Sequence, residues 1–100
     1  MEPLTNPEIR KLKAQAQRME ATFKVGKAGL SAAFLKSVDE GLAHHELVKV
    51  KFAEFKEEKK TLAPELAERT SSQLIMRVGN VAVLYRPKSA PRAFPTEASA

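Results

Sequence analysis

Two short segments with alternating apolar and polar side chains flank a segment of helical spacing in the first half of this 100-residue chain. Residues 21–25 and 47–55 alternate as a half-buried strand requires, because successive side chains of a strand point to opposite faces. Between them, apolar side chains recur at the spacing of one helix face: Phe34, Leu35, Val38 and Leu42. A strand, a helix and a strand in so short a length predict a right-handed crossover between parallel strands.

Another helix is predicted before this unit, over residues 6–20. Thr5 and Glu8 have the spacing of a capping box, in a first turn that also holds Pro7. The apolar residues that follow lie within one arc of the helix. The opposite side carries three cations: Arg10, Lys11 and Arg18.

A third helix follows the charged run at 56–60 and ends near Thr70. Pro64 leaves two starts open for it. The helix begins near Leu62, with the proline in its first turn, or it begins near Glu57 and kinks.

Two final strands complete an α/β fold. Residues 74–78 and 81–86 are rich in strand-forming side chains and flank Gly79-Asn80, a dipeptide that suits a two-residue hairpin turn. The order α-β-α-β-α-β-β predicts a mixed four-stranded sheet with helices packed on it. The length and the 43% apolar content favour one domain over residues 1–86, followed by a Pro/Ala/Ser-rich tail at 87–100 that is predicted to be disordered.

The charge balance narrows the classes of partner that this protein is expected to bind. Lys and Arg number 17 against 12 Asp and Glu, which gives a net charge of +5 and favours polyanions, nucleic acid before an anionic membrane surface. The absence of cysteine excludes disulfides, a thiol nucleophile and cysteine-based zinc sites. No apolar run is long enough to span a membrane, and the N-terminus does not resemble a signal peptide. We therefore expect a cytoplasmic protein without membrane association.

The segment Gly26-Lys27-Ala28-Gly29 joins the strand at 21–25 to the second helix, for which Ser31 is the predicted N-cap. Glycines let a backbone approach a ligand closely, and a helix N-terminus offers unpaired N–H groups and a partial positive charge. With the Lys27 ammonium in the same place, the segment suits a phosphate of a nucleic-acid backbone. A tight turn without a ligand explains the same residues, and the segment lacks the length and the ending of a P-loop.

Strand parity places further cations on one sheet face, if the apolar side chains of all four strands face the core. These cations are Lys24, Lys49, Lys51, Arg77 and Arg86. An ordinary solvated face has the same pattern. In this arrangement Tyr85 falls on the core side and only Phe55 on the basic side, so the face lacks the stacked aromatics of an RNA recognition motif.

Catalytic and metal chemistry find little support. His44-His45-Glu46 reads as a helix end, because adjacent histidines diverge on a helix and no third ligand has metal-site spacing. No Ser/His/Asp arrangement, paired-carboxylate pocket or cofactor motif is recognisable. We expect no enzymatic activity, metal, cofactor or small-molecule substrate.

Four blocks of sequence, in this order, resemble the YhbY family of stand-alone CRM (chloroplast RNA splicing and ribosome maturation) domains. The first begins at Thr5, and the others are FKVGKAGL at 23–30, HHELVKVK at 44–51 and GNVAVLYRP at 79–87. The resemblance implies an RNA-binding domain that is not an enzyme and that associates with precursors of the large ribosomal subunit in bacteria. It also implies a mixed four-stranded sheet similar to the C-terminal domain of bacterial translation initiation factor three.

We therefore predict a monomeric RNA-binding ribosome-assembly factor. The resemblance maps the family's GxxG loop onto residues 26–29 and its basic surface onto the lysines of the sheet. The predicted RNA contacts are Gly26, Lys27, Ala28, Gly29 and Ser31 at the loop, Lys24, Lys49 and Lys51 on the sheet, and Arg10, Lys11 and Arg18 on the first helix. The alternative is a protein-interaction adaptor whose basic faces meet acidic surfaces of ribosomal or other proteins.

Overall fold

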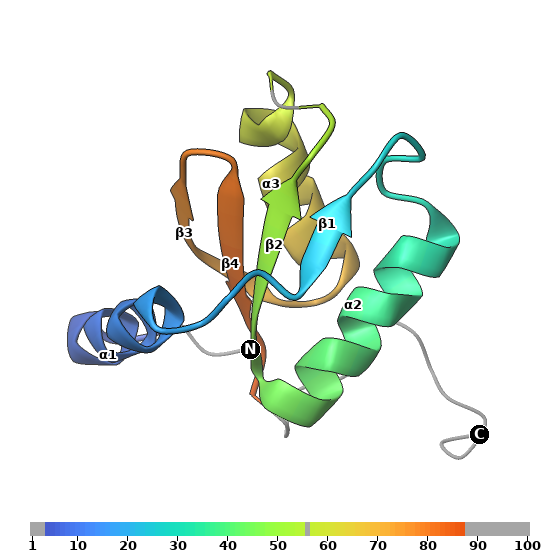
Figure 1. Cartoon of the computed structure of the whole chain (residues 1–100). Helices are drawn as coiled ribbons and strands as arrows, with labels where there is room; N and C mark the ends of the chain where they lie inside the picture. The colour runs from blue at the N-terminus through green and yellow to red at the C-terminus, as the bar shows by residue number, and fades with distance from the viewer. Residues whose placement is uncertain (1–3, 56, 88–100) are drawn as a thin grey trace, which may run out of the picture.

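A computed structural model of the chain describes residues 4–55 and 57–87. Its helices and strands follow the predicted order (Figure 1). The elements are α1 (Asn6–Gln17), β1 (Phe23–Val25), α2 (Ala32–His45), β2 (Leu47–Phe52), α3 (Lys59–Arg69), β3 (Gln73–Val78) and β4 (Val81–Tyr85). Except for Pro87, the predicted tail lies outside the described residues, so the boundary between domain and tail stays a prediction.

One mixed sheet of four strands organises the fold, in the spatial order β1-β2-β4-β3. β1 and β2, which α2 connects, run parallel as predicted, and the β3–β4 hairpin adds two antiparallel strands. α2 and α3 cover one face of this sheet, whereas α1 lies on the other (Figure 1). Because α1 is a single helix at one end of its face, that face is only partly covered.

The larger apolar core lies between the sheet and helices α2 and α3. Val50 and Phe52 of β2 are fully buried there, together with Leu42 of α2 and Leu66 of α3. A smaller cluster forms on the opposite face around Ala16 of α1, which is also fully buried. Alternation in β2 thus serves two unequal cores, one on each side of the sheet.

The capping box predicted for α1 is present, but the helix is shorter than predicted. The backbone N–H of Glu8 donates to the Thr5 hydroxyl at 3.3 Å, and the Thr5 N–H donates to the Glu8 carboxylate at 3.0 Å. The helix ends at Gln17 rather than at residue 20. The reason lies in the last turn, where the N–H of Arg18 donates to the Gln15 carbonyl at 3.1 Å and tightens the helix.

β2 ends at Phe52, although alternation continues to residue 55 in the sequence. The backbone N–H groups of Ala53 and Glu54 both donate to the Val25 carbonyl, at 3.2 and 3.0 Å. These bonds draw the chain across the end of β1. The segment after β2 is therefore held beside the segment after β1.

α3 begins at Lys59, where the N–H of Leu62 donates to the Glu58 carbonyl at 2.9 Å. The start thus lies between the two that the sequence left open. Pro64 lies inside the helix and not in its first turn. Proline has no N–H to donate to the carbonyl four residues earlier, so the helix lacks one internal bond there.

The prediction that all four strands contribute cations to one face is wrong for the hairpin. Lys49 pairs with Val83, which therefore shares the lysine face, whereas Arg77 pairs with Ala82 of the larger core. Tyr85 packs in the smaller cluster and not in the core beneath α2 and α3. Its partial burial, and then the nearby charges of Glu46 and Glu8, raise the pKa of Tyr85 above its ordinary value. Alternation alone does not say which of the two sets of side chains in a strand faces the core, because a slip of one residue exchanges the two faces.

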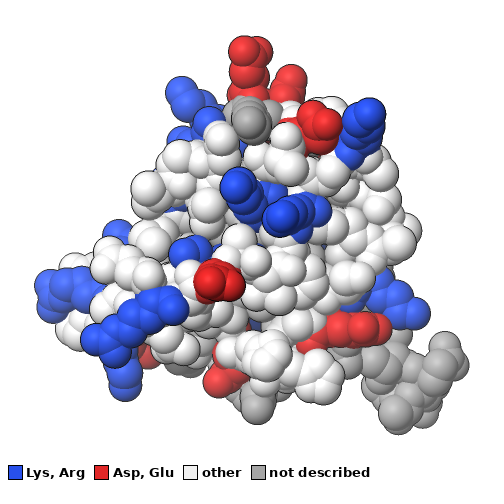
Figure 2. Space-filling model, in the orientation of Figure 1, with Lys and Arg blue, Asp and Glu red and all other residues white. Residues whose placement is uncertain are grey.

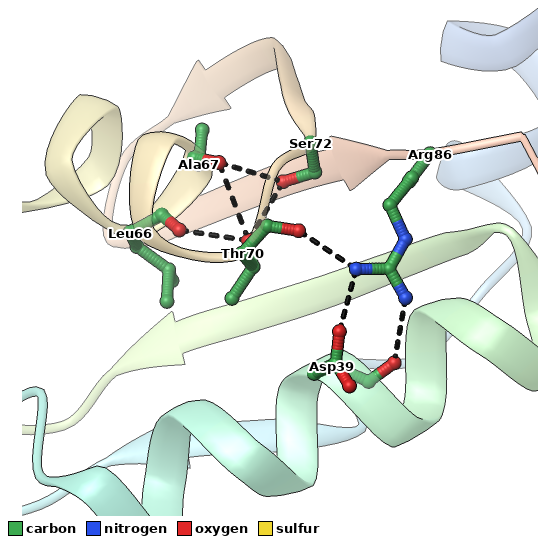
Figure 3. Close-up of polar contacts among 6 residues, drawn as sticks. All are labelled: Asp39, Leu66, Ala67, Thr70, Ser72 and Arg86. Atoms are coloured by element: carbon green, nitrogen blue, oxygen red, sulfur yellow. Dashed lines mark hydrogen bonds and ion pairs between the residues drawn. The ribbon is translucent and has the colours of Figure 1, made fainter. Parts of the chain in front are cut away.

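Arg86 also does not lie on the predicted cationic face, because its side chain is buried. Its Nη1 donates to Asp39 Oδ1 at 2.6 Å and to the Thr70 carbonyl at 2.8 Å, and its Nη2 donates to the Asp39 carbonyl at 2.9 Å (Figure 3). The guanidinium thereby joins the end of β4 to the middle of α2 and to the C-terminal end of α3. Arg86 is a structural cation enclosed by the fold.

Candidate nucleic-acid interface

The segment at residues 26–29 forms a tight turn between β1 and α2, which we call the 26–29 turn. The N–H of Gly29 donates to the Gly26 carbonyl at 3.0 Å. Lys27 and Ala28 occupy the tip of the turn and are exposed. Gly29 has φ +65°, a left-handed conformation that favours glycine because other residues place Cβ too close to the following carbonyl. The turn thus presents Lys27 to solvent on a defined backbone.

The N-terminus of α2 lies next to this turn. The N–H of Phe34 donates to the Ser31 hydroxyl at 3.2 Å, so the predicted N-cap is confirmed. A helix leaves its first N–H groups without partners inside the helix and carries a partial positive charge at this end. The first residues of the helix, Ala32 and Ala33, are exposed. The positive end of α2 and the ammonium group of Lys27 therefore belong to one edge of the molecule.

Two exposed lysines lie on the strands next to the turn. Lys24 of β1 and Lys51 of β2 are partners in the parallel register and lie on the same face. Lys24 is three residues before Lys27 along the chain. Because Val25 and Phe52, the last residues of β1 and β2, are also partners, the turn that follows β1 lies at the same end of the sheet as Lys51.

Lys49 is brought to the same face but has a different role. Its side chain is partly buried, and its Nζ donates to the Met19 carbonyl at 2.9 Å. This bond ties β2 to the segment that leaves α1. Because its ammonium group is already bound within the fold, Lys49 is a weaker candidate for a phosphate contact than Lys24 or Lys51.

The cations of α1 lie on the same side of the molecule. Arg10, Lys11 and Arg18 are exposed, and α1 packs on the sheet face that carries Lys51. Figure 2 shows Lys and Arg side chains over α1 and over the middle of the sheet, whereas acidic side chains lie at the upper edge, beside α1 and along the lower edge. We call Lys24, Lys27 and Lys51 with the three cations of α1 the cationic surface.

An aromatic residue borders the turn and was not among the predicted contacts. Phe55 is 39% exposed, and a Cβ atom on Gly29 would lie 3.4 Å from Cε2 of its ring. A shallow hollow beside it is lined by Ala53, Glu54, Phe55, Glu57 and Glu58. The sequence signal available was a single aromatic residue in an otherwise charged stretch.

The described part of the chain is also relevant to the expectations for the two histidines, for a metal site and for a membrane span. His44 and His45 are exposed on the last turn of α2, as expected for a helix end. Across residues 4–55 and 57–87, no three His, Cys, Asp or Glu side chains are placed to hold a metal ion. Over the same residues, no helix is long and apolar enough to cross a membrane.

The fold and this surface define a small α/β domain with a glycine turn next to exposed lysines. The chain belongs to the family of CRS1 / YhbY (CRM) domains, whose family model matches residues 4–86. The resemblance stated from the sequence is thereby confirmed. The expected likeness to the C-terminal domain of bacterial translation initiation factor three stays a prediction.

Individual relatives agree with this assignment. The Probable RNA-binding protein YqeI of Bacillus subtilis is 34% identical over 84 residues, which cover 83% of this chain and 88% of that protein. A protein of Haemophilus influenzae named RNA-binding protein is 31% identical over 88 residues, 87% of this chain and 89% of its own length. The solution structure of the hypothetical protein SAV1595 from Staphylococcus aureus matches with a TM-score of 0.72 and 32% identity, over 93% of this chain and 98% of that one.

Proposed function

We propose that this protein binds RNA through the 26–29 turn and the cationic surface, and that it acts in assembly of the large ribosomal subunit. The names of its relatives support RNA as the ligand. At the turn, the glycines let the backbone approach a phosphate closely. The N-terminus of α2 offers N–H groups to that phosphate, and Lys27 offers an ammonium group. Contacts of this kind hold phosphates, position the RNA and carry little sequence information.

The observation that carries the proposal is the pairing of Lys24 with Lys51. The two residues are partners on neighbouring strands and are both exposed on one face. Like charges in such positions repel and lower the stability of the sheet. A polyanion that lies across both lysines removes this repulsion. The pair of lysines therefore lowers the stability of the free protein and favours binding of a polyanion.

The first test is the salt dependence of RNA binding. The log of the association constant for a single-stranded oligoribonucleotide is expected to fall with log salt by about 0.7 for each phosphate contact. Lys27→Glu should weaken binding and reduce this slope by about 0.7, while the fold is kept because an exposed loop charge contributes little to stability. An affinity that does not respond to salt would argue against the proposal.

Lys60→Glu is the matched control. It makes the same charge change at an exposed position on α3, which packs on the opposite side of the sheet from α1. Equal losses in the two variants would mean that only net charge matters and that the turn is not a site.

Ribosome assembly needs a test in the cell. The tagged protein should sediment with large-subunit precursors in a sucrose gradient and should leave them after nuclease treatment. Migration as free protein would exclude the ribosomal assignment while leaving RNA binding intact. A complex that survives nuclease would favour the alternative, an adaptor whose basic surface meets acidic proteins.

A further inference from the structure

Phe55 combines exposure with an unusual backbone conformation. Its side chain is 39% exposed, and its φ is +55°, in the left-handed region that bulky residues rarely occupy. Glu46 and Ser71 also have positive φ, but they lie within two residues of the ends of α2 and α3, where left-handed residues commonly end helices. Phe55 follows a strand, so a helix ending does not explain its conformation. Strain of this type is concentrated at sites that bind ligands.

Hydrogen bonds on both sides hold the residue in place. The N–H of Glu54 donates to the Val25 carbonyl at 3.0 Å, and the N–H of Glu58 donates to the Phe55 carbonyl at 3.1 Å. The ring is thereby brought against Gly29, at the end of the 26–29 turn. An aromatic face and a candidate phosphate site therefore lie side by side.

The charges around the ring decide which part of a nucleotide fits there. Glu54, Glu57 and Glu58 line the hollow beside Phe55, and their carboxylates repel phosphate. On the other side of the ring, Lys27 in the turn and the N-terminus of α2 attract phosphate. A nucleotide bound at this edge therefore places its phosphate at the turn and its uncharged base at the ring. Carboxylates accept hydrogen bonds from the amino group of cytosine, which uracil lacks.

We infer that Phe55 is a stacking platform for one unpaired RNA base, and that the adjoining glutamates favour cytosine over uracil. The inference rests on the proposed function, because it needs the phosphate of the same nucleotide at the 26–29 turn. Aromatic side chains that stack on splayed-out bases are a general means of binding single-stranded RNA. The platform adds base recognition to a surface that otherwise reads only the backbone.

The direct test uses Phe55→Trp. The chain contains no tryptophan, so the introduced indole is the only one and reports its own surroundings. Its fluorescence should be quenched when oligocytidylate binds, because the base stacks on the ring. His44→Trp is the matched control, since His44 is exposed at the other end of α2, and its indole should keep its intensity. Unchanged fluorescence of the Phe55→Trp protein at saturating RNA would overturn the inference.

A second variant separates stacking from support of the turn. Phe55→Leu keeps an apolar side chain against Gly29 but removes the aromatic face. It should weaken binding of oligocytidylate roughly fivefold or more, remove the preference over oligouridylate, and leave binding of an abasic ribose-phosphate oligomer unchanged. Val78→Ala, which truncates the other large exposed apolar side chain of the described residues, should change none of these affinities.

The two proposals fail in different ways. Equal loss of the abasic and the base-containing oligomers in Phe55→Leu would mean that the ring only supports the turn, and the inference would be wrong. The same conclusion would follow if Phe55→Leu bound all three oligomers as the unchanged protein does. If Lys27→Glu also left all binding unchanged, the proposed function itself would fail, and the inference with it.

Discussion

Arg86 and Lys51 show two opposite uses of a positive charge in one small domain. Arg86 is buried, and its guanidinium donates to Asp39 and to the carbonyl of Thr70 (Figure 3). Lys51 is exposed and lies beside another lysine on the neighbouring strand. The first cation is neutralised and joins three elements, whereas the second is repelled by its neighbour. A positive charge that is buried with its hydrogen-bond partners stabilises the fold. A positive charge that is exposed beside another positive charge is available to a negatively charged ligand.

The largest effect expected from this comparison follows Arg86→Met. The change leaves the Asp39 carboxylate buried without its cation, and breaking such a pair costs about 3–5 kcal/mol of folding free energy. Urea unfolding followed by circular dichroism measures the loss. For a domain of this size, much of the total stability would be lost.

The double variant Arg86→Met with Asp39→Leu sharpens the result. Removing both charges leaves neither uncompensated, so the double variant should recover a large part of the lost stability. If the two single changes were additive, Arg86 and Asp39 would act independently, and the contrast with Lys51 would lose its basis.

The order of elements could be predicted from the sequence, but the face of each strand could not. Helical and alternating periods locate the helices and strands, and Gly79-Asn80 marks the hairpin. Every side chain of β4 is apolar, so alternation does not say which set faces the larger core. The prediction chose Val83 and Tyr85, whereas Ala82 and Leu84 face that core, and Arg77, the partner of Ala82, lies on the same face. Further from the turn, the register of β3 shifts between Leu74 and Met76, an irregularity that alternation in the sequence does not predict and that brings Leu74 opposite Leu84.

The candidate site shows the same division. Residues 26–29 and Ser31 form a local unit, so their turn and cap follow from neighbours in the sequence. Whether a cation is exposed or enclosed depends on elements far away along the chain, as the bonds from Arg86 to Asp39 and from Lys49 to Met19 illustrate. Phe55 was missed as a contact because its place beside Gly29 depends on bonds that cross from β2 to β1.

Gly29→Ala tests the exposed region without changing any charge. A residue with a Cβ atom in the left-handed conformation of Gly29 lowers the free energy of unfolding by about 1–2 kcal/mol. The added atom would also lie 3.4 Å from the Phe55 ring. Urea unfolding should show this loss, and RNA affinity should fall with it. Gly26→Ala is the control, because its Cβ would meet nothing within 4 Å and its φ is not in the left-handed range. Similar losses in both variants would contradict the assigned geometry.

Lys51→Thr separates stability from binding. Removing one member of the repelling pair should raise the unfolding free energy by about 0.2–1 kcal/mol, while RNA affinity falls because a cation is lost. Arg86→Met should behave in the opposite sense, with lower stability and, where the protein remains folded, unchanged affinity. A Lys51→Thr protein that is less stable than the original would show that the pair is not repulsive and would remove the main support for the proposed function.

The smallest effect is expected at Glu8, a charge at the N-terminus of α1 that is fully exposed. Hydrogen bonds from the Thr5 backbone and then from the Thr5 hydroxyl lower the pKa of Glu8 below its ordinary value of 4.5. Because the folded pKa is the lower one, the stabilisation is present above pH 4.5 and is lost as the pH falls through the folded pKa. Thr5→Ala removes the hydroxyl bonds and should move the Glu8 pKa back toward its ordinary value, which NMR titration of the carboxyl group measures. If this pKa stayed fully depressed, the backbone bond alone would set it, because a single N–H can hold an exposed carboxylate without help from the cap.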